Sequence, residues 1–212
     1  MPELSKQSRH ILLLAAIGLV GAVALPWYVV PSGFWVFAWI SQLGEGSAAP
    51  LLFQALLHDR WQLLPIGLCL VVPIVEIFRP GGPRGTVVAG AGGVGLFWMF
   101  VQGLLIGLKG WNVSLFEQMF GPVASQTGFG VGAVICGSAL LLIFSSGLAL
   151  NGLMRGDGFL VSSIAVVASC IGVFVFYPVF LILVESAVTP EGSYSLAALL
   201  ARVFPPMLAR SH

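Results

Sequence analysis

Five apolar runs, each long enough to cross a lipid bilayer as a helix, constrain this chain more than any other feature. They cover approximately residues 11–30, 61–78, 86–108, 128–150 and 159–184. A helix that rises about 1.5 Å per residue crosses a ~30 Å hydrocarbon core in roughly 20 residues. Only 8% of the residues are charged, so lipid must solvate most of the surface. The sequence therefore predicts an all-α, polytopic transmembrane helical bundle of about five spans.

The segment between the first two runs, residues 33–57, is not a sixth run of this kind. Its aromatic half, Gly33 to Ile40, is too short to cross, and the stretch LGEGSAAP separates it from the rest. This pattern favours a short interfacial or re-entrant helix. A sixth span here is the alternative, and it would reverse the sidedness of everything that follows.

The basic residues between the runs predict the orientation, because Lys and Arg are retained on the cytoplasmic side. An internal N-terminus and an external C-terminus agree best with the higher density of basic residues in the short inner loops. A cleaved signal peptide ending near Ala24 is the alternative, but the apolar run continues to Val30. The inner bases are then Lys6, Arg9, Arg79, Arg84 and Arg155, and the outer ones are Arg60, Lys109, Arg202 and Arg210.

No motif in the sequence indicates catalysis. The chain has no GxxxxGK[ST] phosphate loop, no GxSxG elbow and no HExxH pair, and its three histidines are scattered. A net charge of +1 provides no basic patch for nucleic acid. We therefore expect no enzyme, no catalytic residue, no cofactor, no metal site and no nucleic-acid partner.

The glycines are instead interpreted as helix-packing residues. Gly90, Gly92 and Gly95 match the spacing of a dinucleotide-binding fingerprint, but that fingerprint needs a preceding strand, and these residues lie inside an apolar run. Small residues four apart let helices approach closely in lipid. The predicted packing residues are Gly103 with Gly107, and Gly128 with Gly132.

Ionisable residues inside spans are candidates for function, and this chain has few of them. Glu76 lies near the end of the second run, where we expect it to pair with Arg79 at i+3 in preference to a transport role. Glu185 is expected to mark the outer end of the fifth run. Without a buried acid, a transporter coupled to protons or sodium ions lacks its usual driving group.

The stretch FYPVFLILVESAVTPEGSYSL, residues 176–196, resembles the first core helix of inner-membrane permease subunits of binding-protein-dependent ABC transporters, most of all the ferric-iron type. The resemblance implies a multi-pass protein of the bacterial inner membrane that works with an ATPase subunit and a periplasmic binding protein. Residues 1–158 would be accessory transmembrane helices, and residues 159–212 would begin the permease core. The matching residues are Tyr177, Pro178, Ser186, Gly192 and Tyr194.

The sequence departs from that family in one respect. Such permeases carry an EAA-x3-G loop that docks on the ATPase, and no EAA triplet occurs here. The resemblance therefore implies an N-terminal part of a longer permease, or a chain whose remaining transmembrane helices come from another subunit. The alternative function is a membrane scaffold or assembly subunit, surrounded by lipid, with no substrate path of its own.

Overall fold

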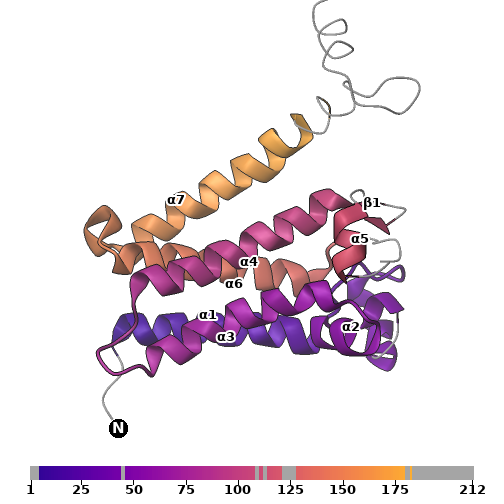
Figure 1. The fold of residues 1–212 in the computed structure, drawn as a ribbon, viewed down its shortest axis with the longest axis horizontal. Helices are drawn as coiled ribbons and strands as arrows, with labels where there is room; N and C mark the ends of the chain where they lie inside the picture. Colours follow the sequence, from indigo (N-terminus) through magenta and orange to yellow (C-terminus); the bar gives the residue numbers. More distant parts are fainter. Residues whose placement is uncertain are drawn as a thin grey trace, which may run out of the picture. The chain divides into compact units, whose positions relative to one another are not determined.

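The computed structural model of this protein describes residues 5–43, 46–107, 110–111, 114–120, 128–179 and 182. The chain forms two compact units, residues 1–163 and 164–212. The predicted domain boundary, between residues 158 and 159, lies at the start of α7. The α-helices are α1 (Lys6–Ala24), α2 (Leu51–Leu57), α3 (Leu64–Ile77), α4 (Gly85–Leu105), α5 (Ser114–Phe120), α6 (Val131–Leu150) and α7 (Gly158–Ile171) (Figure 1).

Four helices are long and apolar enough to cross a membrane, which confirms the predicted all-α membrane fold. They are α1, α4, α6 and the helix that runs from Gly158 to Val179. In that last helix, regular α structure ends at Ile171. The helix itself continues through a π-helical turn, Gly172–Phe176. The described strands are a two-residue pair, β1 (Ile106–Gly107) and β2 (Gly110–Trp111). The chain is therefore a membrane protein built from helices.

The second predicted span is the shortest in the structure as well. It consists of a 3₁₀ turn, Trp61–Leu63, that leads directly into α3, and together they reach about 27 Å. Pro65 lies in the first turn of α3, where a helix needs no amide donor from it. Pro73 lies inside α3 and leaves one carbonyl without its usual helical partner.

Residues 33–57 form short turns, where the sequence predicted one interfacial or re-entrant helix. Three 3₁₀ turns, Phe34–Val36, Ala38–Gln42 and Gly46–Ala48, precede the seven-residue helix α2. Gly33 and Phe37 have positive φ angles of 84° and 56°, which interrupt any continuous helix. A helix of seven residues is about 10 Å long, so the alternative of a sixth span here is excluded.

The first unit is a bundle of α1, α3, α4 and α6. Helix α6 contacts both α1 and α4, and α3 also contacts both α1 and α4 (Figure 1). Each helix therefore has two neighbours around a shared apolar core. Fully buried side chains of that core include Ile11 of α1, Ile66 and Leu70 of α3, Val88 of α4, and Leu140 and Ile143 of α6.

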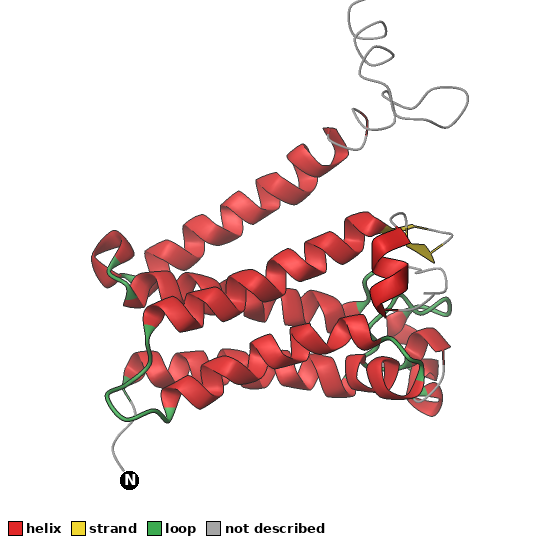
Figure 2. Cartoon of the chain, in the orientation of Figure 1, coloured by secondary structure: helices red, strands yellow, loops and turns green. Residues whose placement is uncertain are grey.

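Loops gather at the two ends of this bundle, as Figure 2 shows. We call one end the basic end: it contains the start of α1, the α3–α4 loop (residues 78–84) and residues 151–157. The other end, the aromatic end, contains residues 25–43, 46–63 and 128–130. Contacts at each end agree with this assignment. At the basic end, Gly85 at the start of α4 lies against Asn151 after α6. At the aromatic end, Gly21 late in α1 lies against Gly132 early in α6.

Candidate functional site

The two predicted glycine pairs, Gly103 with Gly107 and Gly128 with Gly132, do not each lie on one helix. Gly103 lies in α4, but this helix ends at Leu105 and Gly107 belongs to β1. Gly132 lies in α6, but this helix begins at Val131, and Gly128 precedes it with a φ of 97°. The spacing of the glycines could not show that α4 ends and α6 begins between the members of each pair. Glycine is compatible both with a helix and with the turn at its end.

The closest backbone contact of the bundle joins α4 to α6. A Cβ added at Gly92 would lie 2.5 Å from the nitrogen of Phe144 and 2.7 Å from the oxygen of Leu140. A Cβ at Gly147 would overlap the backbone nitrogen of Ala89. Only glycine fits at these two points, since a Cβ cannot approach a backbone atom so closely. The sequence signal was the spacing of small residues at Gly85, Ala89 and Gly92, which share one face of α4.

A second close contact joins α1 to α6. A Cβ at Gly132 would lie 2.7 Å from the oxygen of Leu25 and 2.8 Å from the oxygen of Gly21. A Cβ at Gly18 would lie 2.6 Å from the Leu70 side chain of α3 and 3.0 Å from that of Ala139 in α6. Helix α6 therefore packs through glycine contacts with both α1 and α4, so it is the central packing element of the unit.

The glycines of the apparent dinucleotide fingerprint lie in the middle of α4. Gly92 packs on the α6 backbone, and a Cβ at Gly95 would lie 2.9 Å from the Leu140 side chain. A Cβ at Gly90 would meet nothing within 4 Å. The packing interpretation is thus confirmed for Gly92 and Gly95, while Gly90 lies on an open face.

A charged cluster closes the basic end. The Glu76 carboxylate is 3.4 Å from Arg79 Nη1, which confirms the pair predicted from the i+3 spacing. The same oxygen accepts a hydrogen bond from Arg84 Nε at 2.9 Å and another from the Arg84 amide at 3.2 Å. The contact of Arg84 with Glu76 was not predicted, because it depends on the path of the loop at residues 80–83. Glu76 therefore binds both ends of the α3–α4 loop.

Two buried amides form a polar cluster near the aromatic end of α3 and α4. Gln102 Nε2 and Trp98 Nε1 each donate to the main-chain oxygen of Gln62 at 2.7 Å. Both glutamines are fully buried, and within the described chain three of their side-chain atoms have no partner: Gln62 Nε2, Gln62 Oε1 and Gln102 Oε1. No ionisable residue marks this cluster in the sequence, and the lone glutamine in the apolar run of α4 is the signal that does.

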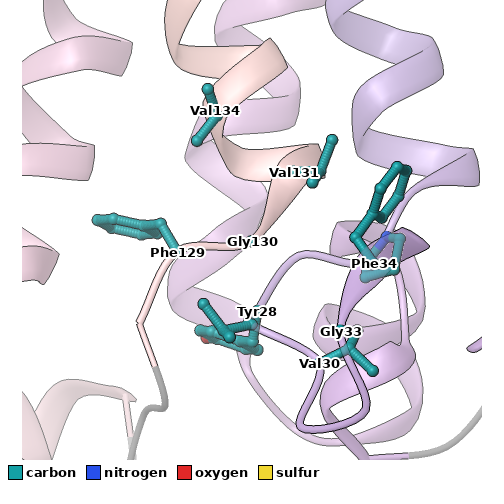
Figure 3. A pocket seen from close by; sticks show the side chains of 10 residues that line it. Tyr28, Val30, Gly33, Phe34, Phe129, Gly130, Val131 and Val134 are labelled. Atoms are coloured by element: carbon teal, nitrogen blue, oxygen red, sulfur yellow. The ribbon is translucent and has the colours of Figure 1, made fainter. Parts of the chain in front are cut away.

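Tyr28 and Arg60 meet at the aromatic end. The guanidinium carbon of Arg60 lies 4.6 Å from the centroid of the Tyr28 ring, a cation–π geometry. Burial raises the pKa of Tyr28, and the nearby positive charge of Arg60 partly opposes that rise. The phenol is therefore neutral at pH 7, and it lines a pocket with Val30, Phe34 and Phe129 (Figure 3).

The described part of the permease-like motif lies at the end of the α7 segment. The π-helical turn Gly172–Phe176 comes directly before Tyr177 and Pro178, and the Tyr177 amide donates to the oxygen of Gly172. Proline causes such a turn because it has no amide hydrogen and its ring would collide with the carbonyl four residues earlier, that of Phe174. Ser186, Gly192 and Tyr194 lie outside the described residues, as does Glu185.

Within the residues that the structure describes, no three histidine, cysteine or acidic side chains group as metal ligands. Comparison with known protein families, curated proteins and solved structures finds no match for this chain. Its function must therefore be argued from its own residues.

Proposed function

We propose that this chain is a membrane-embedded part of an ABC importer permease that moves ferric iron delivered by a periplasmic binding protein. The observation that carries the proposal is the position of Tyr177 and Pro178 on an apolar helix long enough to span a membrane, immediately after a π-helical turn. In the resembling permeases, a tyrosine-proline pair starts the first helix of the transport core. The helix that runs from Gly158 to Val179, which contains this pair near its described end, would have that role here.

The packing of the first unit supports an accessory role for it. Helices α1, α4 and α6 approach so closely at Gly92, Gly132 and Gly147 that no substrate could pass between them at these points. Glu76, the acidic residue of the α3 span, is held by two arginines at the basic end. Transport would therefore depend on the helix that runs from Gly158 to Val179 and on partner helices, with energy from a separate ATPase subunit.

The proposed location is the bacterial inner membrane, with the basic end in the cytoplasm. Lys6, Arg9, Arg79, Arg84 and Arg155 all belong to that end, as the retention of positive residues on the inside requires. The ATPase would then act from the side where the charged loops lie. The periplasmic binding protein would approach the side of the aromatic end.

Ferric-iron uptake in the organism of origin tests this proposal. Replacing Tyr177 and Pro178 together by alanine should reduce uptake of radiolabelled ferric ion to the background of a strain that lacks the gene. The control Val173→Ala, on the same helix, should retain uptake at equal protein abundance. Unchanged uptake in the strain that lacks the gene would contradict ferric iron as the substrate.

A membrane scaffold or assembly subunit is the second candidate. The glycine contacts of α6 with α1 and α4 favour it, because they make a rigid unit that needs no substrate to be complete. Purification of the full complex from native membranes separates the two functions. A stoichiometric ATPase whose activity rises with the binding protein supports the importer, whereas a complex without any ATPase supports the scaffold.

A further inference from the structure

An apolar pocket of about 280 Å³ lies at the aromatic end of the bundle. Three pieces of chain form it: the residues that follow α1, the turn at residues 33–34, and the beginning of α6 (Figure 3). Val134 in its wall is 59% exposed, so the pocket opens on the outer surface of α6. The lining comprises Pro26, Tyr28, Val29, Val30, Gly33, Phe34, Phe129, Gly130, Val131 and Val134.

The main chain around the pocket offers little to a polar ligand. The amide of Gly33 donates to Val30 at 2.9 Å, that of Val29 to Gly128 at 3.1 Å, and that of Gly130 to Trp27 at 2.8 Å. Pro26 has no amide hydrogen at all. The side chains that line the pocket are aliphatic or aromatic, apart from the Tyr28 hydroxyl. An apolar group therefore suits this pocket better than a polar one.

The position of the pocket indicates where such a group would come from. The pocket lies at the ends of two spanning helices, α1 and α6, where the acyl chains of a bilayer meet its headgroups. The adjacent turns expose Trp35 by 82% and Phe37 by 53%, as expected for aromatic side chains at the level of lipid headgroups. The volume lies just below the usual range for small-molecule sites, about 300–1,000 Å³, and suits part of one lipid chain.

Arg60 adds a charge beside this pocket. Its guanidinium stacks on the ring of Tyr28, which lines the pocket. Its Nη1 atom has no hydrogen-bond partner in the residues that the structure describes and is covered there, although Arg60 as a whole is partly exposed. A buried guanidinium nitrogen without an acceptor is costly, and a phosphate oxygen is a strong acceptor for arginine.

From these features we propose that the pocket binds one acyl chain of a phospholipid from the surrounding bilayer, and that Arg60 donates to the phosphate of the same lipid. The bound chain would fill the gap between the segment after α1 and the start of α6. The lipid would then act as a structural ligand of the aromatic end.

A photoactivatable phospholipid, with a diazirine near the end of one chain, tests the acyl-chain site in bilayer nanodiscs of the full chain. After illumination, mass spectrometry should find the label concentrated in residues 26–34 and 128–134. Val134→Trp fills the pocket and should reduce this labelling about tenfold, which corresponds to ~1.4 kcal/mol of binding free energy. Val94→Trp is the matched control, because Val94 of α4 is 60% exposed and outside the pocket.

The labelling pattern of the unmodified chain can overturn this part of the proposal without any variant. Label spread evenly over the spanning helices would show that the pocket holds no lipid chain. Equal labelling of the two tryptophan variants, at the same melting temperature as the original chain, would also show that the pocket holds no lipid chain.

Diacylglycerol with the same photoactivatable chain tests the role of Arg60. Arg60→Gln should reduce labelling by the phospholipid about fivefold, or roughly 1 kcal/mol, and leave labelling by diacylglycerol unchanged. Arg84→Gln makes the same charge change at the basic end and should affect neither lipid. Equal loss of both lipids in Arg60→Gln would show that Arg60 only supports Tyr28, and an unchanged phospholipid signal would exclude the phosphate contact.

Discussion

At the scale of single residues, the bundle depends on points where a side chain has no room. Gly147 of α6 lies against the backbone of Ala89, and Gly92 of α4 lies against the backbone of Phe144. In lipid, such close approach is a main source of helix association, because lipid tails are as apolar as the side chains. These two glycines therefore position α4 against α6 more strictly than the larger apolar residues around them.

Gly147→Ala should destabilise the bundle by about 1–3 kcal/mol, because the added methyl group forces α4 and α6 apart. Thermal unfolding in detergent measures the effect. Gly90→Ala is the control, since a Cβ there meets nothing within 4 Å, and the better helix propensity of alanine should add up to about 1 kcal/mol. Equal stability of the two variants would mean that α4 and α6 do not touch at Gly147.

Glu76→Gln should lower the melting temperature by a few degrees, because the carboxylate accepts from Arg79 and twice from Arg84, and a neutral amide weakens all three contacts. Glu117→Gln, at an exposed position of α5, is the control with the same charge change. Arg79→Gln should have a smaller effect than Glu76→Gln, since Arg84 would still hold the carboxylate. The reverse order would identify Arg79 as the main partner.

At the scale of elements, the α7 segment shows how one proline changes a helix. Asp157 begins the helix in a regular way, because its side chain accepts from the amides of Phe159 and Leu160 at 3.0 and 3.1 Å. The regular α pattern then stops at Ile171, and the π-helical turn opens just before Tyr177 and Pro178. Widened turns of this kind recur at functional sites in other helices, which fits the proposed role of this segment.

Pro178→Ala should convert this turn to a regular α-helix, because alanine supplies an amide that can donate to the oxygen of Phe174. Infrared spectroscopy of a chain with an isotope-labelled carbonyl at Phe174 would show the new hydrogen bond as a shift to lower frequency. Val175→Ala, in the same turn, should leave the band in place. An unchanged band in Pro178→Ala would mean that another residue causes the π-helical turn.

At the scale of the whole molecule, the bundle separates its charges between two ends. The described part of the basic end contains five basic residues, whereas Arg60 is the arginine of the described aromatic end. The order of helices α1, α3, α4 and α6 in the bundle brings the start of α1, the α3–α4 loop and the residues after α6 to one end (Figure 1). Basic residues gathered at one end agree with the rule that Lys and Arg are retained on the cytoplasmic side of a membrane.

Reporter fusions after Gly82 and Gly156 should therefore report a cytoplasmic location, and fusions after Gly46 and Gly110 an external one. A fusion after Gly192 should also be external, although that residue lies outside the described part of the chain. The physical reason is the cost of moving the arginines of the basic end across the membrane. An external signal at Gly82 would invert the whole orientation, and a mixed pattern would contradict the order of the spans.

The sequence by itself determined which stretches form the long apolar helices, although α1 runs from Lys6 to Ala24 where a span over residues 11–30 was predicted. Long apolar runs form helices in lipid whatever they pack against, since every backbone amide must find a partner within its own segment. The pair of Glu76 and Arg79 was predictable for a related reason, because residues three apart on a helix are always neighbours. Neither conclusion needs knowledge of any other element.

Only the tertiary structure decided which small and polar residues matter. Gly90 and Gly92 are two positions apart on α4, yet one faces open space and the other the α6 backbone, and the rotation of α4 about its axis makes that difference. The hydrogen bond of Arg84 to Glu76 depends on the path of a loop, and the pocket at Tyr28 depends on three segments that are distant in sequence. Such contacts follow from how helices approach one another, which no local pattern of residues specifies.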